Sequence, residues 1–321
     1  MIDGGRTDNG ARRAIVVGAG GQDGSYLTDH LTSLGYTVIA IKRDHLVAGS
    51  ARRPFTILDP AAVMDLIKAE RPDEVYYLAA HHQSSQESVG PLRQLIDTSY
   101  DVHCRGLLNA LDAIVAASPH TRLFYAASSL VFGQPSTSPQ NEDTPMVPIC
   151  IYGVTKVAGM GICRAYRREK GVFCCSGILY NHESPRRGTR FVTRKIVQAA
   201  RAIAAHRSAK LQLGDLDAEV DWSYAGDIVR AMHAMLQINS PCDFVIASGI
   251  LHSVRDFADR AFSAAELDYR NHIVQASDML QRVPRKTPLK GDSTRLRDAT
   301  GWRPLVSFQE LVDMMVRAEM T

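Results

Sequence analysis

Residues 14–24 read AIVVGAGGQDG, and this stretch decides the fold. Its apolar start predicts a short buried strand, its glycines predict a tight turn, and the residues after it predict a helix that ends before Gly35. Because Gly18, Gly21 and Gly24 lack side chains, the backbone can approach a pyrophosphate, and the helix N-terminus supplies N–H donors. At a first strand-to-helix junction this pattern favours a dinucleotide site over an ordinary turn.

The chain up to residue 180 alternates short apolar runs with helical patterns. Strands are expected at 14–17, 38–41, 74–78, 123–127 and 173–179, and helices at 59–69, 100–117 and about 152–170. Strands separated by helices predict an α/β fold with a doubly wound parallel sheet of the Rossmann type. After residue 181 the segments become shorter and more basic, which predicts a small mixed α/β lobe. The expected dinucleotide-binding domain comprises 14–180 and about 220–255, and the lobe comprises about 181–219 and 256–321.

The composition is that of a soluble protein with a large core. Hydrophobic residues make up 45% of the 321 residues and charged residues 22%, and the net charge of +3 gives no reason to expect a nucleic-acid partner. Six cysteines without a CxxC pair indicate a reduced, cytoplasmic protein, and no metal site is expected. Residues 1–13 lack an apolar signal core and are expected to form a disordered extension, and no stretch is apolar enough to cross a membrane.

The end of the second expected strand bears on which dinucleotide is bound. Lys42 and Arg43 stand where an acidic residue would bind the ribose hydroxyls of NAD, so they favour the extra phosphate of NADP, and Arg43 is assigned to the cofactor site. Asp44 follows them, so NAD stays possible, as does a solvated surface role for both cations. The other residues expected to line the cofactor are Gln22, Asp23, Asp59, Leu78, Ala79 and Ala80.

Tyr152 and Lys156 form a YxxxK pattern at the start of an expected helix. Residues four apart share a helix face, so the ammonium would lie one turn from the phenol, lower its pKa and make the tyrosine a usable proton acceptor. A solvated tyrosine–lysine pair is the alternative. Ser128 and Ser129 follow the strand expected at 123–127, at the sheet edge where open α/β sheets bind ligands. The glycine loop, Ser128, Tyr152 and Lys156 together predict a hydride-transfer site, with Tyr152 and Lys156 also contacting the cofactor.

Motifs over nearly the whole chain resemble the extended short-chain dehydrogenase/reductases that modify nucleotide sugars, and most closely the GDP-mannose 4,6-dehydratase family. The motifs are GAGGQDGSYL at 18–27, RPDEVYYLAA at 71–80, YGVTK at 152–156, NHESPRRG at 181–188, FVTRKI at 191–196, GDLDAEVDW at 214–222, HSVRDF at 252–257 and GDSTRLRDATGWRP at 291–304. The resemblance implies NADP(H) as cofactor, a GDP-linked hexose as substrate, and a homo-oligomer, either a dimer or a tetramer. It also implies that the C-terminal lobe binds the nucleotide sugar, with Asn181, Arg187 and Arg282 at the phosphates and Ser129 near the sugar.

Two positions depart from the family pattern. After this strand the family carries Thr, one further residue and then Glu, and the glutamate takes part in removing water across C5 and C6 of the sugar. Here the two positions are Ser128 and Leu130. Leucine cannot transfer a proton, and general acid–base catalysis is worth ~10²–10⁴ in rate. The family's arginine before the Asp-Trp pair is replaced by Val220, which removes one phosphate contact.

These departures favour hydride transfer at C4 that ends in reduction or epimerisation over 4,6-dehydration. A dehydratase that uses another base, with His81, His82 or Glu87 as candidates, is the first alternative. The second is a dinucleotide sensor without turnover, which the intact Ser128, Tyr152 and Lys156 argue against.

Overall fold

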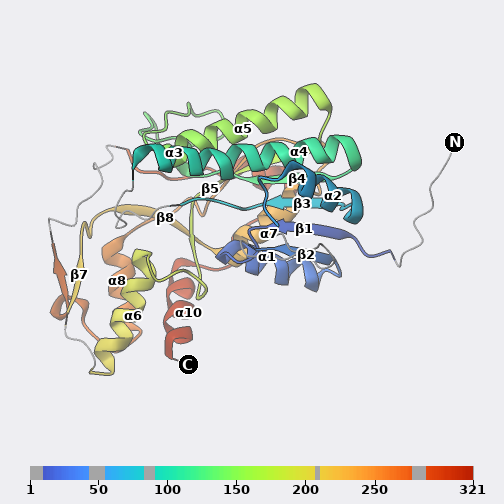
Figure 1. Cartoon of the computed structure of the whole chain (residues 1–321). Coiled ribbons are helices and arrows are strands. Elements are labelled where there is room, and N and C mark those ends of the chain that lie inside the picture. Colours follow the sequence, from blue (N-terminus) through green and yellow to red (C-terminus); the bar gives the residue numbers. More distant parts are fainter. Residues whose placement is uncertain (1–9, 43–54, 83–90, 207–209, 277–286, 321) are drawn as a thin grey trace.

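A parallel sheet of six strands runs through the centre of the computed structural model, which describes residues 10–42, 55–82, 91–206, 210–276 and 287–320 (Figure 1). The strand order is β2-β1-β3-β4-β5-β9. Their bounds are Arg13–Val17 (β1), Thr37–Ile41 (β2), Glu74–Tyr77 (β3), Arg122–Ala126 (β4), Cys174–Leu179 (β5) and Phe244–Ile246 (β9). The chain leaves β1 for β2 on one side and returns to β3 on the other, so the order reverses between β1 and β3. Open α/β sheets bind ligands at the carboxyl ends of the strands beside such a reversal.

Helices cover both faces of this sheet, so the predicted doubly wound α/β architecture is confirmed. On one face lie α2 (Pro60–Glu70), α4 (Gly106–Ala117) and α5 (Ile151–Lys170), and on the other lie α1 (Gln22–Ser33) and α7 (Ala225–Met235). Successive residues of β1 alternate between the two cores, because neighbouring side chains of a strand point to opposite faces. None of the described helices is long and apolar enough to span a bilayer.

A separate apolar core holds the C-terminal lobe together. Trp222 packs against Phe257 and Phe308, and helices from three parts of the chain enclose them. These helices are α6 (Val192–Ala204), α8 (Val254–Ser263) and α10 (Phe308–Met320). Two small sheets complete the lobe, one of β6 (Asn181–Glu183), β8 (Glu219–Tyr224) and β10 (Leu251–Ser253), the other of β7 (Leu211–Leu213) and β11 (Ile273–Gln275). The lobe differs from the expected division in two respects. Strands β8 and β10 and the side chain of Trp222 belong to the lobe although they fall within the 220–255 segment expected in the other domain. Conversely, Leu296 of α9 (Thr294–Thr300) and Trp302 are buried in the core between the main sheet and α7.

The helix expected at 100–117 is interrupted. Helix α3 (Leu92–Tyr100) leads into a π-helical turn at Asp101–Arg105 (η1), and α4 begins only at Gly106. A side chain at Gly106 would lie 2.3 Å from the Tyr77 hydroxyl, so the helix packs closely on β3 at this point. An apolar pattern at helical spacing does not distinguish a π turn from continuous α-helix, which is why the interruption was not predicted.

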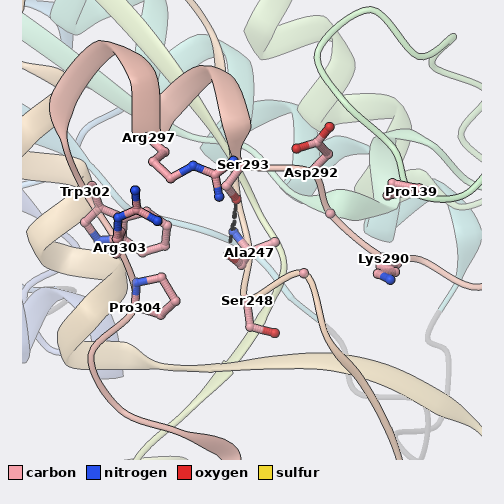
Figure 2. Close-up of a pocket in the computed structure, with 12 residues that line it drawn as sticks. Pro139, Ala247, Ser248, Lys290, Asp292, Ser293, Arg297, Trp302, Arg303 and Pro304 are labelled. Atoms are coloured by element: carbon pink, nitrogen blue, oxygen red, sulfur yellow. Dashed lines mark hydrogen bonds between the residues drawn. The ribbon is translucent and has the colours of Figure 1, made fainter.

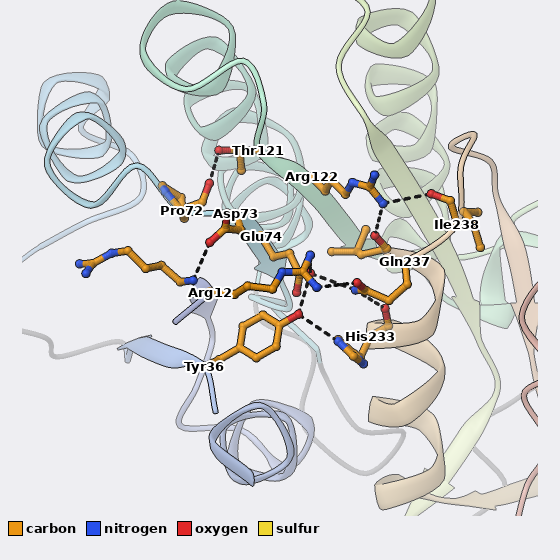
Figure 3. A network of polar contacts seen from close by, with 12 residues as sticks. Arg12, Tyr36, Pro72, Asp73, Glu74, Thr121, Arg122, His233, Gln237 and Ile238 are labelled. Atoms are coloured by element: carbon orange, nitrogen blue, oxygen red, sulfur yellow. Dashed lines mark hydrogen bonds and ion pairs between the residues drawn. The ribbon is translucent and has the colours of Figure 1, made fainter. Parts of the chain in front are cut away.

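A buried carboxylate, that of Glu74, connects several segments at the amino ends of the strands (Figure 3). Glu74 is fully buried and accepts hydrogen bonds from the Tyr76 hydroxyl (2.6 Å), the Tyr36 hydroxyl (3.1 Å) and the Gln237 amide (2.9 Å). Arg12 pairs with it at 2.7 Å. The prediction of a disordered extension at 1–13 is therefore too long, because Arg12 is held by this network and Arg13 begins β1; residues 1–9 lie outside the described part.

Candidate active site

The glycine loop after β1 leaves no room for a side chain at Gly18 or Gly24. Gly18 has φ +95°, and a Cβ on it would lie 2.9 Å from the Ala79 amide nitrogen; a Cβ on Gly24 would lie 2.3 Å from the Gly18 carbonyl oxygen. Gly21 is the N-cap of α1 and offers no capping side chain, so the first N–H groups of the helix are left for a ligand. Leu78 and Ala79 after β3 border the same loop. These residues fit the pyrophosphate of a dinucleotide at the reversal of strand order.

The residues predicted at the ribose end of the cofactor are only partly described. The Lys42 stem passes 3.6 Å from where a Cβ of Gly20 would stand, which places this cation beside the glycine loop. Arg43 and Asp44 lie outside the described residues. Asp59 caps α2 by accepting from the backbone N–H groups of Ala61 and Ala62. Ala80 is exposed directly after the Leu78–Ala79 segment.

Tyr152 and Lys156 lie in the first two turns of α5, and Lys156 is almost completely buried. The Lys156 ammonium donates to the Ala126 carbonyl at 2.7 Å, which anchors it to the end of β4. It also lies over two aromatic rings, 5.5 Å from the Tyr152 centroid and 5.0 Å from that of Tyr125. The helix face predicted from the YxxxK spacing therefore brings the two side chains together.

The pKa of Tyr152 is raised in the protein alone, so the expected lowering by Lys156 is wrong for this state. Burial raises it first, the Asp23 carboxylate raises it further, and the Arg187 guanidinium lowers it in part. Burial also lowers the pKa of Lys156 to about 7, so its ammonium is itself poorly stabilised. The sequence spacing predicted the contact between Tyr152 and Lys156. It did not predict the burial that favours the neutral form of both side chains.

The strand-end serines pack on the start of α5. Ser128 caps a 3₁₀ turn at Ser129–Val131 (η2), its hydroxyl accepting from the Leu130 N–H at 3.3 Å. A Cβ on Gly153 would lie 2.5 Å from the Leu130 carbonyl oxygen, so this turn touches the residue that follows Tyr152. Ser129 is buried, whereas Ser128 and Leu130 are half-buried. Leu130 thus occupies the turn that packs on the start of α5, next to Tyr152.

An ion pair between Asp23 and His182, which the sequence analysis did not identify, joins α1 to the lobe. His182 in β6 faces both oxygens of the Asp23 carboxylate at 2.9 Å, while its other ring nitrogen contacts the Tyr180 carbonyl at 2.7 Å. Burial alone would raise the pKa of Asp23, but His182 brings it to about 2 and the pKa of His182 is raised in turn. Gln22 extends the link by donating to the His182 carbonyl and accepting from Ser184. Both partners stood in quoted motifs, but only the fold brings them together.

Two of the predicted substrate residues, Asn181 and Arg187, lie in or just after β6 of the lobe. Arg187 pairs with the buried Glu183 at 3.1 Å and stacks on Phe191, its guanidinium carbon 3.4 Å from the ring centroid. The ring of Phe191 contacts His82, and the His82 ring meets Tyr152 edge-on at 5.0 Å between centroids. Asn181 is exposed at the first position of β6, and Arg282 and Glu87 lie outside the described residues.

Two further features were not found from the sequence. His103 is a fully buried imidazole that contacts Tyr152, and no local pattern marks it. An open pocket of about 600 Å³ lies beyond the end of β9, where Ser248, Lys290, Arg297 and Arg303 are among the lining residues (Figure 2). Neither Tyr152 nor Lys156 lines that pocket, so it is separate from the predicted hydride-transfer site.

The amino-acid sequence is similar to that of a known enzyme family and its members. The profile of the family described as GDP-mannose 4,6 dehydratase matches residues 15–315. GDP-mannose 4,6 dehydratase 1 of Arabidopsis thaliana is 37% identical over 328 residues, covering 94% of this chain and 88% of the relative. The human GDP-mannose 4,6 dehydratase is 33% identical over 95% of this chain and 91% of its own length.

Solved structures share the fold. The structure of RMD from Pseudomonas aeruginosa complexed with NADPH superposes with a TM-score of 0.83 at 22% identity, over 96% of this chain and 98% of that one. The UDP-glucose 4-epimerase of Thermus thermophilus in complex with NAD gives a TM-score of 0.78 at 22% identity, over 95% and 98% of the two chains. The resemblance inferred from the motifs is confirmed: the chain belongs to the GDP-mannose 4,6-dehydratase family of NAD(P)-dependent nucleotide-sugar enzymes.

Proposed function

We propose that this enzyme transfers a hydride at C4 of a GDP-linked hexose, with NADP(H) as cofactor, and that the reaction ends in reduction or epimerisation. The observation that carries the proposal is Leu130, an apolar side chain in the turn beside Tyr152 where the family pattern has a glutamate. A leucine there cannot remove or return the protons that loss of water requires.

The cofactor assignment rests on the glycine cradle and on Lys42. The close approaches at Gly18 and Gly24 leave room for a backbone-bound pyrophosphate, and the bare N-terminus of α1 favours its negative charge. Lys42 beside the loop suits the additional phosphate of NADP. Bound NADP(H) would supply the hydride acceptor or donor.

Tyr152 is the proton-transfer group in this proposal. When C4 is oxidised its phenolate takes the hydroxyl proton, and when a C4 ketone is reduced its phenol returns that proton. The Ser128 hydroxyl, which is half-buried at the end of β4, donates a hydrogen bond to the same sugar oxygen. Lys156 lies close enough to the Tyr152 ring for its ammonium to stabilise a phenolate once it forms. Arg187, whose charge acts on both Asp23 and Tyr152, is assigned in this proposal to the phosphates of the nucleotide sugar.

A 4,6-dehydratase with a different base is the second candidate, and one contact favours it. The His82 ring lies edge-on to Tyr152, on the side of Phe191 and the lobe. An imidazole can exchange protons near neutral pH, so His82 is the described residue best placed to replace the missing glutamate.

The two candidates differ in the mass of the product. Incubation of the protein with NADP⁺ and GDP-mannose, followed by mass spectrometry, is expected to show no loss of water, whereas Leu130→Glu is expected to produce a small amount of the dehydrated sugar. Leu130→Gln has a similar shape without a carboxylate and should yield none. Water loss by the wild-type protein at an enzymatic rate would exclude the reductase or epimerase proposal, and abolition of that loss by His82→Phe would identify the base.

A further inference from the structure

A buried imidazole, that of His103, lies edge-on to the ring of Tyr152. It has no part in the proton and hydride transfers proposed above. His103 stands in the π-helical turn η1 and is 0% exposed. Its ring is perpendicular to that of Tyr152, with 5.2 Å between the centroids and an interplanar angle of 88°. A polar ring buried at this depth must be hydrogen-bonded or it would destabilise the fold, so its partners show what it holds in place.

Both ring nitrogens of His103 are engaged, and the partners fix its tautomer. The backbone N–H of His81 donates to Nε2 at 3.0 Å, so Nε2 carries no proton. Nδ1 must then carry the hydrogen, and it donates to the Thr155 hydroxyl at 2.7 Å. The Thr155 hydroxyl in turn donates back along α5, shared between the carbonyls of Ile151 (3.0 Å) and Tyr152 (3.1 Å). A chain of hydrogen bonds therefore runs from the loop after β3, through one imidazole, to the first turn of α5, which carries Tyr152.

The surroundings of the imidazole favour its neutral form. Burial, and then the nearby Lys156 ammonium, lower the pKa of His103 to about 2, and His81 and His82 act in the same direction. It cannot serve as a general acid or base at neutral pH. A neutral ring with one donor and one acceptor, each matched to a different element, is suited to holding those elements at a constant separation.

We propose that His103 is a positioning residue that fixes the first turn of α5 against the loop after β3, and so sets the distance between the Tyr152 phenol and the cofactor. The inference rests on the proposed function, in which Tyr152 transfers the proton and the loop through Leu78 and Ala79 borders the cofactor. His103 thus connects the helix that carries the proton-transfer group with the loop that borders the cofactor. Hydride and proton transfer both require these two elements to lie at the correct distance from each other. A misplacement of about 1 Å in such a geometry can cost ~10² in rate.

The test compares variants of the full chain in single-turnover hydride transfer, followed by nicotinamide absorbance with NADP⁺ and GDP-mannose. His103→Phe keeps the ring contact with Tyr152 but removes both hydrogen bonds, and it is expected to slow hydride transfer by about 10- to 100-fold. The KM for the sugar should change by no more than about twofold, because ground-state binding is not what the bridge supports. His103→Asn retains an amide donor within reach of Thr155 and should recover part of the rate. The deuterium isotope effect on the hydride step should be fully expressed in His103→Phe.

Thr155→Val tests the same bridge from its other end. It removes the acceptor of the Nδ1 hydrogen without changing the side-chain volume, so it should slow hydride transfer, and combining it with His103→Phe should cause little further loss. Additive losses would contradict a shared bridge. If His103→Phe does not fold, His103→Asn and Thr155→Val still decide the question.

Two reference variants separate the possible failures. Leu111→Ala removes a buried side chain two turns further along α4 and is expected to lower the melting temperature while leaving the hydride rate unchanged. A rate loss in Leu111→Ala equal to that in His103→Phe would reduce His103 to a packing role and overturn the inference. Wild-type rates in His103→Phe together with an inactive Tyr152→Phe would also overturn it. An active Tyr152→Phe would instead refute the proposed function.

Discussion

Lys156 is a buried amine that the folded protein holds at a cost to its own stability. Burial lowers its pKa to about 7, from ~10.4 in an unfolded chain. Between these two values the unfolded state binds more protons than the folded state, so stability should rise with pH from about 7 to about 10 and carry the full penalty below that window. A residue that the proposed function places in the reaction is therefore also a weak point of the fold.

Lys156→Met should convert this weak point into ordinary packing. We expect the variant to be more stable than wild type by roughly 1–3 kcal/mol at pH 7, less the cost of the unsatisfied Ala126 carbonyl, and to lose the pH dependence of this window. Urea unfolding at pH 7, 8 and 9 measures the difference. Lys170→Met, at the exposed end of the same helix, serves as the control and should leave the curve unchanged. Parallel pH curves for Lys156→Met and wild type would mean that the amine is hydrated.

Lys42 is the described cation that can distinguish the two dinucleotides. Lys42→Glu would place a carboxylate beside the glycine loop, repelling the extra phosphate of NADP while accepting from ribose hydroxyls of NAD. The affinity for NADPH should therefore fall by about tenfold or more, and that for NADH by much less. Fluorescence titrations with both cofactors check this. Equal losses for the two would place Lys42 away from the ribose phosphate.

At the scale of an element, the glycine loop offers a matched pair of substitutions. Gly24→Ala would set a methyl group 2.3 Å from the Gly18 carbonyl, and only a shift of α1 could relieve this contact. Such overpacking costs about 1–3 kcal/mol, and the shift should weaken NADPH binding strongly. At Gly20 a Cβ would meet only the flexible Lys42 stem at 3.6 Å, so Gly20→Ala should bind NADPH nearly as well as wild type. Similar losses in both variants would argue against a tight cradle.

The elements were largely predictable, and their exceptions have physical causes. The loop at 18–24 and the turn at 152–156 were found because each depends on residues close in sequence. The Asp23–His182 pair was not, since its partners are 159 positions apart and no local pattern links them. The π turn that carries His103 interrupts a continuous apolar pattern, and the raised pKa of Tyr152 reflects burial by the whole fold.

At the scale of the whole molecule, a stabilising network and the predicted site lie at opposite ends of the same strands. The Glu74 network joins the N-terminal segment, β3 and the chain just after α7 at the amino ends (Figure 3), while the glycine loop and the Tyr152–Lys156 pair lie at the carboxyl ends. Changes in the network should therefore alter folding without altering the reaction. The homo-oligomer, cytoplasmic location and nucleotide-sugar lobe inferred from the sequence stay predictions at this scale.

Glu74→Leu should destabilise the protein by roughly 3 kcal/mol, because the buried hydroxyls of Tyr36 and Tyr76 would lose this acceptor and Arg12 would lose its partner. Glu70→Leu breaks the half-exposed pair with Arg13 and should cost only about 0–1 kcal/mol. Chemical denaturation measures both, and the hydride rate of each folded variant should match wild type. A change in rate without a change in stability would show that the network communicates with the site.

The turn at Ser129–Val131 has a consequence for how such an enzyme diverges. The described contacts of Leu130 are made by its own backbone groups: its N–H donates to the Ser128 hydroxyl, and its carbonyl lies against Gly153. The side chain at position 130 can thus be exchanged while the turn keeps its shape. For an evolving lineage, a change at one codon could then redirect a shared ketone intermediate toward a different product, with folding and cofactor affinity inherited intact. Saturation mutagenesis at this single position would sample those evolutionary routes directly.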